Sequence, residues 1–377
     1  MAEDLIIYTP MYIALFWAVV LFISKKEGSK AKILLGILMV VDFFLFLSLA
    51  VFYHESAVFH YFEPVYTFTF LSLYPLLYWY IKLLTIETTY LWKNFVFFIP
   101  AVFFSMASLI VYHIMNEAER QAFYNYFHLN RKSDIEFTLY MNLQKFIFMF
   151  SKLIFVAQAV YYVIFGHKLV KKYNHEIANF YSNLEKKSIG WVNFMLFALI
   201  SCLIITIAYN IVGRGFFVDY PVLLFIPNLI LGILVFLLGY QGYLQNHTIY
   251  NLEIEANQNN DALLPKNVNK QKLNEKLLEL FVNEAIYKHP DLKITHISEK
   301  LHTNRTYISK HINTEFSCTF SDFVNRYRIE EAKRLLIEDS SKTYSLNYIS
   351  EKSGFGSMGS FMRVFREMEL KHRYKRS

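Results

Sequence analysis

Residues 297–300 read Ile-Ser-Glu-Lys, and residues 349–352 read the same four amino acids. In both copies this tetrapeptide is followed by a short turn and then by a stretch with two large apolar residues four positions apart. These apolar pairs are Ile308 with Ile312 and Phe361 with Phe365. The second turn contains Gly354, which can adopt the positive φ that a tight turn between helices often requires. Each copy, about 20 residues long, therefore fits a helix-turn-helix unit.

The segment between the two copies has the apolar spacing of one long helix over 319–338. Its apolar residues are Phe320, Phe323, Val324, Tyr327, Ala332, Leu335 and Leu336. A further amphipathic helix precedes the first copy, from about 270 to His289-Pro290, and this part of the chain has no strand pattern. The C-terminal part is therefore predicted to be all-α, with a central helix that joins two helix-turn-helix units.

Each second helix carries a basic residue two positions beyond its first apolar residue, Lys310 in the first unit and Arg363 in the second. At this spacing both side chains project away from the core. Residues 270–377 contain 20 Lys and Arg against 14 Asp and Glu. Basic side chains on such helices contact phosphates and base edges in the major groove of DNA. The matched pair therefore predicts double-stranded DNA as a partner.

The N-terminal part of the chain has a different composition. Up to about residue 243 it is rich in Phe, Leu, Ile, Val and Tyr, whereas Asn, Lys and Glu are frequent after it. A chain of 377 residues with 55% apolar and 18% aromatic residues is too apolar for one soluble domain. We therefore expect a membrane domain at 1–243, a linker at 244–270 and a C-terminal domain at 271–377.

Seven stretches of the membrane domain reach the roughly 20 apolar residues that a helix needs to cross a bilayer. They are 5–23, 33–53, 62–84, 93–115, 141–165, 189–212 and 220–243. Lysines are concentrated in the loops at 24–32 and 166–188, whereas the other loops carry few or balanced charges. Basic loops stay in the cytoplasm. The sequence therefore predicts a seven-helix protein of the bacterial cytoplasmic membrane, with its N-terminus outside and its C-terminal domain in the cytoplasm.

Two charged residues are our intramembrane polar candidates. Asp42 lies near the middle of the second predicted span and Lys152 near the middle of the fifth. Isolated charges in a membrane are costly, so they normally pair or line a wet cavity. Either the two form an ion pair, or each reaches polar surroundings independently. Asn193, Asn210 and Asn228 in turn either line a ligand pocket or form hydrogen bonds between helices.

The C-terminal domain resembles the DNA-binding domain of the AraC/XylS family of bacterial transcription activators. The resemblance covers about 275–370 and rests on an ordered set of residues. The set is Phe323-Val324-Asn325-Arg326-Tyr327-Arg328-Ile329-Glu330-Glu331-Ala332-Lys333-Arg334-Leu335-Leu336, Ile349-Ser350, Gly354-Phe355-Gly356-Ser357 and Phe361-Met362-Arg363-Val364-Phe365-Arg366. The family fold implies two recognition helices in successive major grooves. The DNA-contacting positions that it implies are Arg305, Thr306, Ser309 and Lys310 in the first helix and Ser357, Met358, Gly359 and Arg363 in the second.

The C-terminal end departs from the family pattern. The family usually closes with Gly-x-Thr-Pro-x-x-Tyr-Arg, but here Phe365 is followed by Arg-Glu-Met-Glu-Leu-Lys-His-Arg-Tyr-Lys-Arg-Ser. The Thr-Pro pair is missing, and Tyr374 comes about two residues early. We therefore expect an altered closing segment, with the basic run Lys371–Arg376 available for nonspecific phosphate contacts.

Membrane spans ahead of such a domain resemble the membrane-bound regulators of this family. We interpret the chain as a one-component regulator that senses a signal, either a ligand or a protein, through its membrane domain. The signal is expected to pass through the last span and the linker, and a homodimer would suit palindromic operators. A membrane transporter with a regulatory DNA-binding tail is the alternative.

Missing residues exclude other classes of protein. The last predicted span has no lysine for a retinal Schiff base. The three glycines after residue 270 all lie in the second helix-turn-helix, which excludes the nucleotide-binding boxes of a sensor kinase. The two cysteines, Cys202 and Cys318, indicate neither a disulfide framework nor a zinc site. We therefore expect no enzymatic activity, no catalytic residue, no metal and no cofactor.

Overall fold

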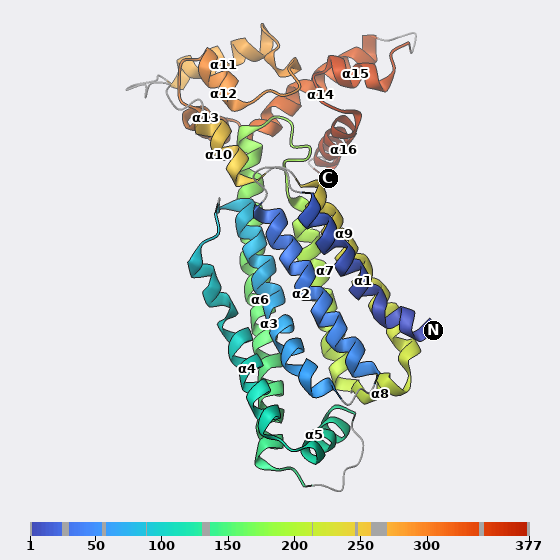
Figure 1. Cartoon of the computed structure of the whole chain (residues 1–377). Helices are drawn as coiled ribbons and strands as arrows, with labels where there is room; N and C mark the ends of the chain where they lie inside the picture. Colours follow the sequence, from blue (N-terminus) through green and yellow to red (C-terminus); the bar gives the residue numbers. More distant parts are fainter. Residues whose placement is uncertain are drawn as a thin grey trace. The chain divides into compact units, whose positions relative to one another are not determined.

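The computed structural model describes residues 2–24, 30–54, 58–87, 89–129, 136–212, 214–245, 248–257, 270–338 and 343–374. The regular elements in these ranges are all helices (Figure 1), so the prediction of an all-α protein is confirmed for the described part of the chain. Contacts between residues divide the chain into two compact units. The N-terminal unit comprises Met1–Val170 and Ile189–Ile249, and the C-terminal unit comprises Lys171–Ser188 and Tyr250–Ser377.

The N-terminal unit is a bundle of long helices with shorter helices at their ends (Figure 1). Its elements are α1 (Ala2–Ile23), α2 (Lys30–Tyr53), α3 (Phe59–Thr85), η1 (Trp92–Phe98), α4 (Ile99–Ile114), α5 (Glu117–Phe123), η2 (Tyr124–His128), α6 (Leu139–Phe180), α7 (Gly190–Val212), α8 (Arg214–Asp219), η3 (Pro221–Leu224) and α9 (Phe225–Leu244). In this bundle α2 packs against α1 and α3, and α9 packs against α1, α2 and α7. Large apolar side chains such as Phe103 and Leu153 remain exposed, as expected of helices that face lipid.

Two glycines let α9 lie close to its neighbours. A Cβ atom on Gly239 would lie 2.3 Å from Cγ of Trp17 on α1, and one on Gly242 would lie 2.0 Å from Cδ2 of Leu35 on α2. Small residues are frequent where membrane helices meet, because lipid provides no hydrophobic force between the helices and close packing must replace it. The position of α9 therefore depends on these two missing side chains.

Four helices in the described part of the chain are long and apolar enough to cross a membrane, so the predicted number of seven is wrong. They are Lys30–Tyr53, Trp92–Ile114, Leu139–Phe180 and Val222–Leu244. The apolar run of the first helix is shorter, at Ile7–Ile23. The predicted span 62–84 lies in α3, but buried polar residues, among them Glu63 and Lys82, make α3 less apolar. In α7, which covers the predicted span 189–212, several side chains lie outside the described residues.

Buried polar clusters satisfy the two charges of α3. The partners of Glu63 are Tyr112, His128 at 2.9 Å and Gln144 at 3.1 Å. The partners of Lys82 are Glu87 at 2.5 Å and Asn94 at 2.7 Å. Neither cluster was predicted, because Glu63 and Lys82 lie at the ends of a predicted span and some of their partners are distant in sequence. His128, for example, is 65 residues from Glu63.

Asp42 and Lys152 do not form the ion pair considered above. The Lys152 ammonium lies over the ring of Phe148, 4.1 Å from its centre. Asp42 instead lines a cavity together with Asn228, and no ion pair joins it to Lys152 among the residues that the structure describes. Asn193 forms a 3.1 Å hydrogen bond with His167, and the side chain of Asn210 lies outside the described residues.

The C-terminal unit is built around α14. Its helices are α10 (Ile249–Asn257), α11 (Lys270–Val282), η4 (Ile286–Lys288), α12 (Ile294–Lys300), α13 (Arg305–Glu315), α14 (Phe320–Glu338), α15 (Leu346–Lys352) and α16 (Met358–Tyr374). Phe323, in the first half of α14, packs against Phe281 and Phe316. The second half contributes Ile329 and Ala332 to a core with residues of α15 and α16. The single helix α14 thus supports both helix-turn-helix units. Residues 258–269 of the predicted linker lie outside the described residues.

Candidate nucleic-acid interface

The two helix-turn-helix units, α12 with α13 and α15 with α16, repeat the same backbone hydrogen bonds. The His302 amide donates to the Glu299 carbonyl at 3.1 Å, and the Gly354 amide donates to the Glu351 carbonyl at 3.0 Å. The next amide in each turn donates to the carbonyl of the serine in the repeated tetrapeptide, at 2.9 and 3.0 Å. Both turn residues have a positive φ, 47° for His302 and 87° for Gly354. The expected positive φ of Gly354 is confirmed, and its counterpart at His302 was not predicted.

Gly354 is also required by a close contact. A Cβ atom at this position would lie 2.6 Å from Cα of Lys288 and 2.6 Å from the carbonyl oxygen of Tyr287, both in η4. At the matching place in the first turn, His302 carries an exposed side chain. The second turn therefore needs glycine for its conformation and for its packing, whereas the first turn needs only the conformation.

A polar side chain caps each recognition helix. The Asn304 side-chain oxygen accepts a hydrogen bond from the Thr306 amide at 2.7 Å, at the start of α13. The Ser357 hydroxyl accepts one from the Ser360 amide at 3.1 Å, at the start of α16. Both residues are favoured N-caps because they satisfy an amide that has no partner within the helix. The buried anchors of the two helices are Ile308 and Ile312 in α13 and Phe361 and Val364 in α16.

The predicted DNA contacts lie on α13, on α16 and directly before α16. Thr306, Lys310, Gly359 and Arg363 are exposed, and Arg305, Ser309, Ser357 and Met358 are half-buried. Lys310 and Arg363 therefore lie on the outer faces of the two helices, as their spacing predicts. Met358 packs against the core of the second unit. Arg305 and Ser357 have partners in a segment of the predicted membrane domain 1–243.

This segment is Lys171–Ser188, which we call the strap, and it comprises the end of α6 and the loop that follows. The Ser182 amide donates to the Leu292 carbonyl at 3.0 Å, and the Ser182 carbonyl accepts from the Ser321 hydroxyl at 3.0 Å. The Ser182 hydroxyl accepts from Nη2 of Arg328 at 3.1 Å. The strap is therefore bound to the loop before α12 and to the central helix α14.

The strap also reaches the N-terminal ends of both recognition helices. The guanidinium carbon of Arg305 lies 5.5 Å from the ring centre of Phe180, within the range of a cation–π contact. The Ser357 hydroxyl donates a hydrogen bond to the Glu185 carboxylate. Anions are favoured at the N-terminus of a helix, which is where a DNA phosphate also binds. Glu185 therefore places a carboxylate where α16 could receive a phosphate.

Arg328 holds the centre of the domain together. It is 1% exposed, and it donates to the Tyr287 carbonyl at 2.8 Å and to the His289 carbonyl at 2.7 Å. Burial lowers the pKa of its guanidinium to about 10, so the group stays charged at neutral pH. In the sequence, Arg328 stands out only as part of the family pattern, because its backbone partners lie about 40 residues away.

Glu331 is the second charged residue of this core. Its carboxylate lies 2.9 Å from Nε of Arg334 and 2.7 Å from Nζ of Lys288. Hydrogen bonds from Arg334 and then from Lys288 lower the pKa of the Glu331 carboxyl to about 2. The carboxylate is thus ionised at any pH at which the protein would bind DNA. No group of three or more His, Cys, Asp or Glu suited to a metal ion occurs in the described ranges.

Comparison with known families agrees with this geometry. Residues 297–370 match the model of a helix-turn-helix domain family, of the AraC type. The matched range begins at the first copy of the repeated tetrapeptide and covers α13 and most of α16. The chain matches no protein of curated function and no solved structure. The C-terminal part of the chain therefore contains an AraC-type DNA-binding domain.

Proposed function

We propose that this protein is a membrane-bound one-component transcription regulator, whose N-terminal unit senses a signal and whose C-terminal unit binds DNA sequence-specifically. The observation that carries the proposal is the helix-turn-helix match at 297–370, in a chain that also has four candidate membrane spans. A DNA-binding domain joined to such helices is held at the membrane surface. Regulation would then follow from changes within the bundle.

The proposed DNA contacts are the positions that the family resemblance implies. They are Arg305, Thr306, Ser309 and Lys310 on α13 and Ser357, Met358, Gly359 and Arg363 at α16. Lys310 and Arg363 are the best supported of these contacts, because both side chains are exposed. Arg305 and Ser357 become available only if the strap releases them, because both contact it. Met358 is the weakest candidate, since part of its surface is used in the core.

The proposed orientation places the C-terminal unit in the cytoplasm. The strap and Tyr250–Ser377 form one compact unit, so they lie on the same side of the membrane. The strap contains four lysines, Lys171, Lys172, Lys186 and Lys187. Basic segments beside membrane helices are retained in the cytoplasm, where DNA is present. For both of its ends to lie on that side, the intervening segment Ile189–Ile249 is proposed to cross the membrane through α7, in addition to the four candidate spans, and to return through α9.

The signal is proposed to travel through α6 as well as through the last span and the linker. α6 is one helix from Leu139 to Phe180, and about 63 Å long at 1.5 Å per residue, so a shift within the bundle would move the strap. Because the strap contacts Arg305 and Ser357, such a shift changes what the two recognition helices offer to DNA.

Selection of DNA from a random library by the full-length protein in lipid nanodiscs tests the DNA-binding part. Two recognition helices in successive major grooves should select two short elements about 10 base pairs apart. A palindromic repeat of these elements would support the predicted homodimer. Recovery of unrelated sequences alone would contradict sequence-specific regulation.

Reporter fusions at the C-terminus test the orientation. A fluorescent protein should be active at this position, and a periplasmic alkaline phosphatase should be inactive. The reverse pattern would place the C-terminal unit outside the cytoplasm and overturn the proposal.

A further inference from the structure

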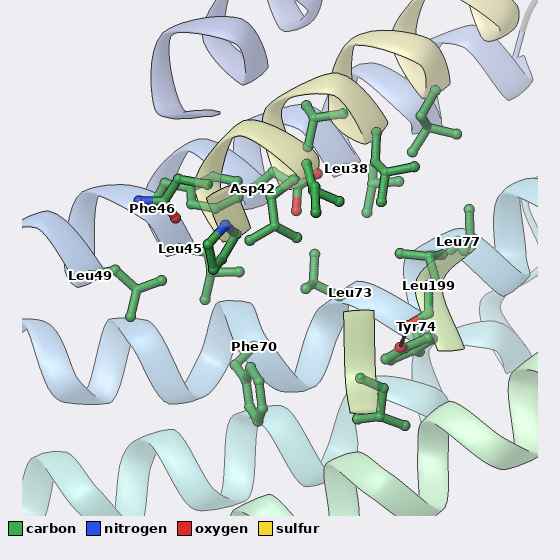
Figure 2. Close-up of a pocket in the computed structure, with 18 of the residues that line it drawn as sticks. Leu38, Asp42, Leu45, Phe46, Leu49, Phe70, Leu73, Tyr74, Leu77 and Leu199 are labelled. Carbon is green, nitrogen blue, oxygen red and sulfur yellow. Dashed lines mark hydrogen bonds between the residues drawn. The ribbon is translucent and has the colours of Figure 1, made fainter. Parts of the chain in front are cut away.

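The N-terminal unit contains a cavity of about 250 Å³ (Figure 2). Residues of α1, α2, α3, α6, α7, η3 and α9 line it, so it lies inside the bundle. Its wall runs from Asp42, in the middle of α2, to Tyr53 at the end of α2 and Leu224 at the end of η3. Small-molecule sites typically have volumes of roughly 300–1,000 Å³. The cavity lies just below this range and therefore suits a ligand smaller than most.

Among the described residues that line the cavity, Asp42 alone is charged. Figure 2 shows it beside Leu38 and Leu45 of α2, with Phe70 and Leu73 of α3 lining the cavity below them. The Asp42 side chain is 7% exposed, and among the described residues nothing is placed to hydrogen-bond or pair with its carboxylate. A lone carboxylate in a membrane bundle is costly and usually marks a functional site. A cation or a hydrogen-bond donor on a bound molecule would supply a partner for this carboxylate.

Aromatic rings form another part of the wall. The rings of Phe70 and Phe155 are stacked with their centres 3.6 Å apart. Tyr66 lies against Phe70 at 5.3 Å, and Tyr74 lies against Phe155 at 5.2 Å. The Tyr74 hydroxyl donates a hydrogen bond to the Leu199 carbonyl at 3.4 Å, as the dashed line in Figure 2 shows. With its hydroxyl bound there, Tyr74 contributes mainly its ring to the cavity wall. This wall favours an apolar or aromatic ligand, and its rings also favour a nearby cation.

We propose that the cavity binds a lipophilic amine, a molecule with one ammonium group on an apolar body, and that the ammonium group pairs with Asp42. An anionic ligand would be repelled by the carboxylate, and a wholly apolar one would leave it without a partner. A bare metal ion needs several oxygen ligands, whereas the wall supplies one carboxylate and few other polar groups. The role of this amine as the signal rests on the proposed function, whereas its binding to the bundle does not depend on it.

The binding test uses full-length protein in nanodiscs and three probes of the same size: 4-phenylbutylamine, 4-phenylbutanol and 4-phenylbutanoic acid. Thermal unfolding and calorimetric titration measure the binding of each probe. The amine should raise the unfolding temperature, and the alcohol and the acid should do so much less. Equal effects of the three probes, or no effect of the amine, would overturn the proposal.

Two variants locate the site. Asp42→Asn removes the charge and should weaken amine binding about tenfold or more, because a hydrogen bond to a charged group is worth at least that much. Without ligand this variant should be as stable as the parent, since the change removes an unpaired buried charge. Glu117→Gln removes an exposed carboxylate from α5 and should leave amine binding unchanged. Amine binding that is equal in the Asp42→Asn variant and the parent would place the ligand elsewhere and overturn the proposal.

DNA binding gives an independent measurement. If the amine binds through Asp42 and also changes the affinity of the protein for its selected DNA, both the cavity and the proposed function are supported. If the amine binds through Asp42 without any change in DNA affinity, the ligand site stands and its role as the signal is wrong. The two proposals can therefore fail separately.

Discussion

The two helix-turn-helix units form the same turn with different residues. His302 and Gly354 are 52 positions apart, follow the same tetrapeptide and make the same amide hydrogen bond. Both have the positive φ that favours glycine. The first turn accepts a histidine because its side chain is exposed. In the second turn a Cβ atom on Gly354 would lie only 2.6 Å from backbone atoms of η4. A shared backbone conformation therefore sets a preference for glycine, and the neighbouring segment decides whether glycine is obligatory.

Gly354→Ala should produce the largest effect. The new Cβ atom would collide with the backbone of Lys288 and Tyr287, and alanine would also be strained at this φ. We expect a loss of about 3 kcal/mol in the free energy of unfolding of the C-terminal unit. Limited proteolysis of the full-length protein in nanodiscs would measure it. Gly359→Ala is the control, because its Cβ would meet only the Ser357 hydroxyl, at 3.9 Å, and it should be nearly neutral.

Removing one charge from each recognition helix in turn shows how much each helix-turn-helix unit contributes to DNA binding. Lys310→Ala and Arg363→Ala should each weaken binding to the selected DNA by about 1–3 kcal/mol, since both side chains are exposed on the predicted contact face. Fluorescence anisotropy at several salt concentrations would measure the loss. Lys300→Ala removes the same charge from α12 and should change the affinity much less. If one recognition-helix variant behaves like this control, its unit does not contact DNA as proposed.

Removal of the Glu185 carboxylate of the strap should favour DNA binding by the second helix-turn-helix unit. Glu185→Gln keeps a hydrogen-bond acceptor for Ser357 but removes the negative charge from the start of α16. Affinity for DNA should rise by roughly 0.3–1 kcal/mol, the usual size of a charge effect at a helix terminus. Glu176→Gln, elsewhere on the strap, is matched in charge and should have a smaller effect. Equal gains for the two variants would indicate a general charge effect and no competition at α16.

The smallest effect is expected from making the first turn like the second. His302→Gly relieves the left-handed strain, which costs about 1–2 kcal/mol for a residue with a side chain. The greater freedom of glycine in the unfolded chain offsets roughly 0.4–1 kcal/mol of this gain. A small rise in the unfolding temperature of the C-terminal unit should therefore be measurable by calorimetry. His302→Ala keeps the Cβ atom and should give no rise.

Much of the DNA-binding domain could be predicted from local sequence. The repeated tetrapeptide marks the two units directly, and helical periodicity gives the long helix at 319–338 and the outward positions of Lys310 and Arg363. The left-handed turn was predicted only where glycine marks it, since a histidine at that position has no local signature. The predicted span 62–84 is one of the three that are not among the four candidates: α3 is apolar in most positions, but it carries charged residues whose partners lie outside it.

The pairing of Asp42 with Lys152 could not be settled by counting charges. Each lies near the middle of a predicted span, and sequence alone does not say which helix faces which. The packing places Lys152 over Phe148 and leaves Asp42 on the wall of a cavity. The candidate ligand site therefore came from the arrangement of the helices.

By itself the sequence determined that this chain joins apolar helices to two helix-turn-helix units, because periodicity and composition act over a few neighbouring residues. Only the tertiary structure decided that the strap belongs to the DNA-binding domain. Its hydrogen bonds connect Ser182 to residues 139 and 146 positions away, and Glu185 to one 172 positions away. It likewise decided that the first turn tolerates a histidine while the second does not, because the difference lies in the segment that packs against each turn.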